Sequence, residues 1–198
     1  SLSPDVSDPG FRPYSFEQMH QAYKEQIEGL VRGGVDMILI ETCFDALNVK
    51  AALSACQAVG NIPVMVSVSV GDRSGRTLTG QTLEAFYTSV KHYPLLAFGL
   101  NCSLGAAEMT TLLEDVNKWC ECGVSCYPNA GLPNEMGGYD QTPEQMGDAV
   151  KVMAEKGLVN ILGGCCGTSP AHIKAIAQAV KGIPARSKSS NSRHIKDM

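Results

Sequence analysis

The sequence lacks the features of several common protein classes. No apolar run approaches the roughly 20 residues that span a bilayer, and the first residues have neither the basic nor the apolar region of a signal peptide. Basic residues are not in excess, because 16 Lys and Arg stand against 20 Asp and Glu, with a formal net charge of −4. Such a balance gives no attraction for phosphate backbones. We therefore expect a protein that binds neither membrane nor nucleic acid.

The composition also lacks the marks of a disordered or a disulfide-stapled chain. Hydrophobic residues make up 44% of the 198 residues and charged residues only 18%, which predicts a packed core in one domain or part of a larger one. The eight cysteines belong to a chain longer than the small secreted proteins that depend on disulfides. We expect a cytoplasmic protein whose thiols stay reduced, with some of them available as metal ligands.

Short apolar runs rich in β-branched residues recur along the chain and predict strands. They begin near Asp36, Ile62, Leu95, Gly123 and Leu158. These starts lie about 26 to 35 residues apart, which is the length of one strand plus its crossover helix. The runs are continuous rather than alternating, as is typical of parallel strands buried on both faces.

Helical patterns fill the intervals, and capping signals at Ser15, Thr142 and Ser169 begin three of the predicted helices. This alternation predicts an α/β fold. No G-x-G-x-x-G follows the first strand, which argues against a dinucleotide-binding open sheet. The other common closure is a (β/α)8 TIM barrel, of which the chain would carry roughly the last five βα units within residues 1–184. Residues 185–198 are polar and predict a flexible tail.

Thiols gather where predicted strands end, which is where parallel α/β folds place their active sites. Cys165 and Cys166 lie between glycines at one such end, and Cys102 ends the strand two positions earlier. Zinc favours tetrahedral sulfur, and three protein ligands with an open fourth position is the catalytic arrangement. We therefore predict a zinc site at these three cysteines. Two unrelated buried thiols, or a strained vicinal disulfide, are the alternatives for the adjacent pair.

Polar residues at two other strand ends are candidates for binding a small substrate. Glu41 directly follows an apolar run, and its carboxylate suits an ammonium group, although a surface carboxylate is the simpler interpretation. Asn129 ends the fourth predicted strand, where it is either a turn residue or an amide close to the same metal. Asp45 is expected to cap the helix that follows it.

Other reactive side chains predict no further site. Cys120, Cys122 and Cys126 resemble a second ligand cluster, but Cys120 falls on an apolar helix face and Cys126 inside a strand. We interpret them as ordinary thiols. The four histidines lie on predicted helices or in the tail, which gives no support to a histidine-based catalytic pair.

Five segments of the chain together resemble a known family. In order and spacing, from about Ser1 to Pro184, they are similar to the homocysteine-binding module of cobalamin-dependent methionine synthase, within the homocysteine S-methyltransferase family. The segments are residues 41–52 (ETCFDALNVKAA), 74–82 (SGRTLTGQT), 99–102 (GLNC), 127–134 (YPNAGLPN) and 163–168 (GGCCGT).

The resemblance implies a fold, a reaction and partners. The family's module is a (β/α)8 barrel whose zinc ligands correspond to Cys102, Cys165 and Cys166, and whose substrate-contacting glutamate corresponds to Glu41. Zinc activates the thiol of homocysteine, which takes a methyl group from methylcobalamin held on another domain and becomes methionine. Folate- and cobalamin-binding domains are then the expected partners. The family's Asp-Gly-Ala-x-Gly-Thr segment does not occur among the 198 residues.

Two interpretations of other kinds stay open at this point. A phosphate-binding barrel enzyme could use the loop at Gly163 and the helix start at Ser169 as an anion site. A non-catalytic partial barrel would bind no homocysteine even with metal present.

Overall fold

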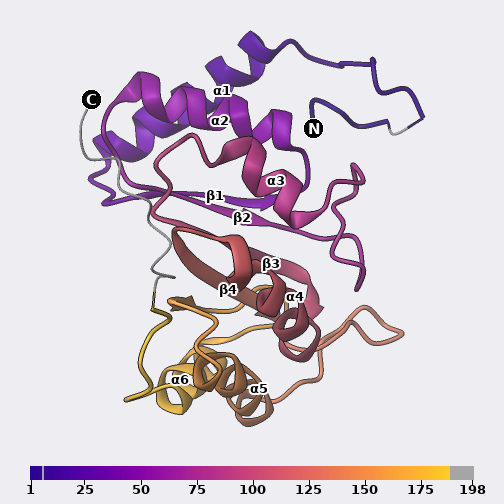
Figure 1. Ribbon diagram of the computed structural model, residues 1–198, viewed down its shortest axis with the longest axis vertical. Coiled ribbons are helices and arrows are strands. Elements are labelled where there is room, and N and C mark those ends of the chain that lie inside the picture. The colour runs from indigo at the N-terminus through magenta and orange to yellow at the C-terminus, as the bar shows by residue number, and fades with distance from the viewer. Residues whose placement is uncertain (6, 188–198) are drawn as a thin grey trace.

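The computed structural model describes residues 1–5 and 7–187, in which helices and strands alternate along the chain (Figure 1). The helices are α1 (Phe16–Arg32), α2 (Ala46–Val59), α3 (Leu83–Val90), α4 (Ala106–Trp119), α5 (Pro143–Glu155) and α6 (Pro170–Ala179). The strands are β1 (Ile38–Cys43), β2 (Val64–Val68), β3 (Ala97–Gly105), β4 (Gly123–Asn129) and β5 (Ile161–Leu162). The predicted α/β alternation is confirmed. Most of the predicted flexible tail, residues 188–198, lies outside the described residues.

The strands form one parallel sheet in the order β1-β2-β3-β4-β5, so each strand pairs with its neighbour along the chain. This sequential order is that of a (β/α)8 barrel wall, whereas a doubly wound sheet reverses its order at a switch point. Within the described residues β1 and β5 form two edges and the wall does not close. The structure is therefore the predicted partial barrel of five βα units.

The last strand is shorter than its apolar run predicts. Only Ile161 and Leu162 pair with β4, whereas Leu158 and Val159 are buried without ladder partners. Burial in the core, rather than strand pairing, accounts for the apolar character of these two residues.

The core lies between the sheet and the helices that pack on one of its faces. Val66, Phe98 and Val124 point to this face and have no exposed surface. Met109 of α4 and Met146 of α5 are equally buried from the helical side. In Figure 1, α1 packs on α2, which lies against β1 and β2, and α5 and α6 lie at the far end of the molecule. Among the described residues, every helix is too short or too polar to cross a membrane.

The other face of the sheet carries small and polar side chains, because alternate strand residues point to opposite faces. Ser67, Asn101 and Ser125 lie there and are fully buried. Gly99 is required between them, since a Cβ at this position would overlap the carbonyl oxygen of Ser125. This close approach of β3 and β4 places their carboxyl ends side by side.

Helix ends follow the local signals in the sequence. Ser15 and Thr142 form complete capping boxes at α1 and α5. Asp45 accepts hydrogen bonds from the backbone at the start of α2, as expected for a cap. At the other end of the chain, Arg186 is buried and hydrogen-bonded, so packed structure continues beyond Pro184.

Candidate metal and substrate site

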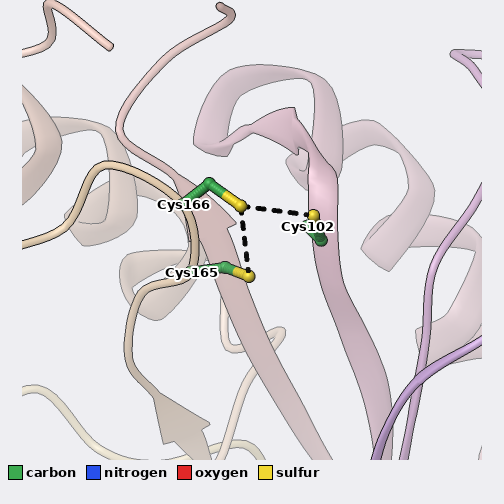
Figure 2. A group of neighbouring side chains, drawn as sticks. All are labelled: Cys102, Cys165 and Cys166. Atoms are coloured by element: carbon green, nitrogen blue, oxygen red, sulfur yellow. Dashed lines mark hydrogen bonds between the residues drawn. The ribbon is translucent and has the colours of Figure 1, made fainter. Parts of the chain in front are cut away.

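The structure brings three thiols together at the carboxyl edge of the sheet. Cys102 belongs to β3, and Cys165 and Cys166 lie in the loop between β5 and α6. The Sγ of Cys166 lies 3.6 Å from that of Cys102 and 3.9 Å from that of Cys165. Figure 2 shows the sulfur atoms pointing toward one another. All three lie within 4.8 Å of one another, and the three residues are half-buried. All eight cysteines are free thiols, so the adjacent pair does not form a vicinal disulfide.

The spacing of these sulfur atoms fits a tetrahedral cation. Zinc–sulfur bonds of about 2.3 Å at tetrahedral angles place ligand sulfurs about 3.8 Å apart. The observed separations of 3.6 and 3.9 Å lie on either side of that value. Thiolates also select soft or borderline cations over calcium and magnesium. In residues 1–5 and 7–187 this is the one cluster of three or more potential ligands of the kinds His, Cys, Asp or Glu. It could hold zinc with a fourth position open.

Backbone hydrogen bonds fasten the cysteine loop to the end of β4. The N–H of Cys165 donates to the carbonyl of Pro128 at 2.8 Å, and the N–H of Ala130 donates to the carbonyl of Cys166 at 2.9 Å. The Oδ1 of Asn129 accepts a third bond from the N–H of Cys166 at 3.1 Å. Asn129 is itself buried, with 2% exposure. The position of the two thiols is therefore set by a strand more than thirty residues earlier in the chain.

The glycines before the cysteine pair are needed for this docking. A Cβ at Gly163 would lie 2.6 Å from the ring of Tyr127, and one at Gly164 would overlap Thr168. The loop therefore lies too close to its neighbours for any larger residue. The two glycines before the cysteine pair are therefore required for steric reasons.

Asn101 links the strand ends to the thiols, and it was not among the predicted site residues. Its Oδ1 accepts hydrogen bonds from Ser67 Oγ at 2.6 Å and Thr42 N at 3.1 Å. Its Nδ2 donates to Thr42 Oγ1 at 2.8 Å and contacts Cys165 Sγ at 3.7 Å. A polar residue at an inward position of a buried strand, directly before Cys102, is the signal that could have identified it.

Strained backbone surrounds the same asparagine. Thr42, Cys102 and Ser103 have φ values of 58°, 63° and 65°, a left-handed conformation that non-glycine residues rarely adopt. The pairing register of β1 shifts between Ile40 and Cys43, and that of β3 shifts between Asn101 and Gly105. Strain of this kind concentrates where surrounding bonds impose it, frequently at functional sites. Here the Asn101 amide holds Thr42, while Cys102 is turned toward the other two thiols.

Burial and neighbouring groups shift the acidities at the site. Burial raises the pKa of Cys165 to about 11, partly opposed by the hydrogen bond from Asn101. Tyr139, which lies against Gly167, also has a raised pKa, first through burial and then through its hydrogen bond with Cys166. Without a bound cation, Cys165 is therefore a neutral thiol near pH 7, and a metal ion must displace its proton. Tyr139 is a second neighbour of the thiols that the sequence analysis missed.

Glu41 lies on β1, exposed, at the same carboxyl edge of the sheet. Its carboxylate has no hydrogen bond or ion pair with any residue that the structure describes. It does act on Tyr127 of β4, whose pKa is raised first by burial and then by the charge of Glu41. Its negative charge is thus directed toward the face of the sheet that carries Tyr127. This placement is compatible with the predicted role in substrate binding, which stays a prediction.

The other groups considered in the sequence do not form a second three-thiol site among the described residues. Cys126 points into the core, where its Sγ contacts Met109 Sδ at 3.4 Å, away from Cys120 and Cys122. At the start of α6, the Ser169 backbone and hydroxyl bind the imidazole of His172, so the helix is capped by its own side chains. This internal cap weakens the phosphate-site alternative.

Comparisons with known proteins concern the fold and the family. The apo form of the homocysteine methyltransferase MmuM from Escherichia coli superposes with a TM-score of 0.70 at 22% identity, covering 84% of this chain and 57% of that one. Its metallated form gives 0.71 at 22% identity, covering 89% and 56%. These likenesses show the shared fold, and the chain spans little more than half the length of MmuM. The homocysteine S-methyltransferase family model matches residues 1–180, and the chain therefore belongs to this family.

Proposed function

We propose that this chain carries the homocysteine-activating site of a zinc-dependent methyltransferase that produces methionine. The observation that carries the proposal is the convergence of Cys102, Cys165 and Cys166 within 4.8 Å at the carboxyl edge of the sheet, in a member of this family. Their sulfur spacing suits zinc, and three thiolate ligands leave one position for the sulfur of the substrate. Bound zinc would supply a Lewis acid that lowers the pKa of the substrate thiol, so that the nucleophilic thiolate exists at neutral pH.

The residues around the thiols would hold them in place for substrate. Asn101 orients Cys165 through its amide nitrogen, and Asn129 fixes the backbone of Cys166. Asn129 Nδ2 has no hydrogen-bond partner in the part of the chain that the structure describes, and this donor is available to the substrate. Positioning of this kind is worth about 10- to 100-fold in metal affinity.

Glu41 would bind the amino group of homocysteine. Its carboxylate is unpaired among the described residues and is directed to the face of the sheet where Tyr127 lies. An ammonium–carboxylate contact beside the sheet would orient the substrate with its sulfur toward the three cysteines. The charge of Glu41 would then hold the amino end of homocysteine, and coordination to the metal would hold its sulfur.

In the transfer step the substrate sulfur gives up its proton and forms a new bond to the methyl carbon. The bond between that carbon and its donor breaks, and its electron pair stays with the donor. We propose methylcobalamin on another domain as the donor, because the five segments resemble the cobalamin-dependent branch of the family. Folate- and cobalamin-binding domains are the partners that follow from this assignment.

Metal analysis of the purified, reduced chain tests the proposal. We expect one zinc per chain after dialysis. Loss of a contact that only supports a ligand lowers metal affinity roughly 10- to 100-fold, and we expect Cys165→Ser, which removes a ligand, to lower zinc affinity more than this. Cys56→Ser is the matched control, because Cys56 is fully buried in α2, away from the site, and should leave zinc binding unchanged. Stoichiometric, tightly bound zinc in Cys165→Ser would contradict the assignment.

X-ray absorption at the zinc edge then tests substrate binding. Adding homocysteine should raise the number of sulfur ligands from three to four. A non-catalytic partial barrel would show three sulfur ligands with and without homocysteine.

A further inference from the structure

Cys120 and Cys122 form a second pair of thiols, remote from the three-thiol site. Their Sγ atoms lie 3.7 Å apart. Cys122 directly precedes β4, whereas the cysteine loop is fastened to the far end of that strand. A strand of 7 residues separates the two places, a distance of roughly 20 Å at about 3.3 Å per residue. Chemistry at this pair therefore need not involve the predicted metal ligands.

The two thiols differ in access. Cys120 ends α4 and is 2% exposed, whereas Cys122 is only partly buried. The Cys120 thiol is directed at Cys122, with its Sγ 3.8 Å from the Cys122 carbonyl oxygen as well as close to its sulfur. Of the two residues, Cys122 is therefore the more accessible to a reagent from solvent.

A buried arginine holds the backbone of this pair. The guanidinium of Arg186 donates to the carbonyl of Cys120 at 2.6 Å and to that of Cys122 at 3.0 Å, and its Nε donates to Asn117 at 2.6 Å. On the other side, the hydroxyl of Tyr87 accepts a hydrogen bond from the N–H of Glu121 at 3.1 Å. The backbone of this short turn is therefore held on both sides, beside the permanent positive charge of Arg186.

The pKa values of the two thiols are shifted in opposite directions. The pKa of Cys122 is lowered to about 7, first by the hydrogen bond from Cys120 and also by that from the Tyr87 hydroxyl, while burial opposes them. The pKa of Cys120 is raised, first by the same hydrogen bond and then by burial. Glu121, the nearest carboxylate in the chain, points to solvent, where it pairs with Lys91. Of the two sulfur atoms, that of Cys122 therefore loses its proton more readily.

We propose that Cys120 and Cys122 are a hydroperoxide-reactive dithiol that closes to an intramolecular disulfide, with Cys122 attacking first and Cys120 resolving. The Cys122 thiolate attacks one peroxide oxygen, the O–O bond breaks, and the leaving hydroxide takes a proton and becomes water. Cys122 is then a sulfenic acid. The sulfur of Cys120 loses its proton and attacks that of Cys122, the S–S bond forms, the S–O bond breaks, and a second water leaves. Two thiols are oxidised by two electrons and one peroxide is reduced to two waters.

The geometry requires little movement for this closure. The sulfur atoms must approach from 3.7 Å to the bonded distance of about 2.05 Å, which side-chain rotation can supply. The Arg186 contacts are made by backbone carbonyls, so they do not restrain the sulfur atoms themselves.

Peptide mapping of the full reduced chain after brief exposure to hydrogen peroxide tests the proposal. Free thiols are alkylated in denaturant at the end of the exposure, and fragmentation of each peptide then identifies the oxidised cysteines, whether or not metal is bound. We expect Cys120 and Cys122 to lose two hydrogens together and to escape alkylation until a reductant is added, whereas Cys126 on the same tryptic peptide is alkylated. Cys56 and Cys126, which are fully buried with raised pKa values, serve as internal references and should oxidise at least roughly 10-fold more slowly.

Two variants test the order of attack. Cys120→Ser should accumulate a Cys122 sulfenic acid that dimedone labels, whereas Cys122→Ser should leave Cys120 reduced over the same time. Equal dimedone labelling of Cys120 and Cys122 in these variants would overturn the assignment of roles. Oxidation of Cys122 at the rate of Cys126 in the unmodified chain would overturn the proposal, and that measurement does not depend on the folding of either variant.

Discussion

Replacing Asn101 by Ala should weaken both the fold and the metal site. The amide joins three strands, because it bonds Ser67 on β2 and Thr42 on β1 from its own place on β3. It also donates to Cys165. Removal leaves the fully buried hydroxyl of Ser67 and the N–H of Thr42 without their acceptor. An unsatisfied buried group costs about 1–3 kcal/mol, so we expect the free energy of unfolding to fall by about 2–4 kcal/mol.

The effect on metal binding is separate from the effect on stability. Loss of the N–H···S contact removes a group that orients a predicted ligand, which corresponds to a roughly 10- to 100-fold loss of zinc affinity. Asn101→Asp should keep the two acceptor bonds while placing a negative charge beside Cys165. We expect this variant to lose zinc affinity with a smaller loss of stability than Asn101→Ala.

Urea unfolding of the metal-free chain and chelator competition for zinc measure the two effects. Asn160→Ala is the matched control, because this asparagine also makes two side-chain bonds, to Val124 N and Arg186 O, at the opposite end of the sheet. Asn160→Ala should lower the free energy of unfolding but leave the zinc affinity unchanged. If Asn101→Ala and Asn160→Ala change zinc affinity equally, the amide of Asn101 does not position the site.

Three further predictions concern the sheet, a helix cap and the substrate. Gly99→Ala places a methyl group on the Ser125 carbonyl and should lower the free energy of unfolding in urea by about 3 kcal/mol or more. The control, Gly29→Ala on the exposed face of α1, should raise it by about 0.5–1 kcal/mol. Equal effects of the two substitutions would contradict the close approach of β3 and β4. Asp45 is buried, which raises its pKa, but the hydrogen bonds to its carboxylate outweigh burial and hold the pKa below its usual value. The ionised carboxylate therefore stabilises the fold fully above the ordinary carboxyl pKa of about 4, and this stabilisation is lost as the pH falls through the lower pKa of the folded state. The difference in the free energy of unfolding between the unmodified chain and Asp45→Asn should narrow below pH 4. A constant difference between pH 7 and pH 3 would refute this. Glu41→Gln should lower homocysteine affinity roughly 10- to 150-fold in calorimetry of the zinc-loaded protein, with zinc content unchanged; unchanged affinity would remove Glu41 from the site.

The helices, the strands and the type of fold could be predicted from local patterns in the sequence. Apolar runs separated by capped helical segments predict alternating parallel strands and helices, and the structure has them in that order. These signals are local: a capping box at Ser15 or Thr142 depends on residues three positions apart. The sequence also placed Cys102, Cys165 and Cys166 at one edge, because parallel strands all end on the same side of a sheet.

The contacts between distant side chains could not be predicted in this way, because they depend on how the strands pack. Asn101 binds Thr42 and Cys165, 59 and 64 positions away, because the register of three neighbouring strands aligns them. Arg186, in a segment whose composition predicts a flexible tail, is buried because it finds the carbonyls of Cys120 and Cys122. The alternation of polar and apolar residues sets which face of the sheet a side chain occupies, but which distant side chain it meets there depends on how neighbouring strands pack, as in the close approach at Gly99.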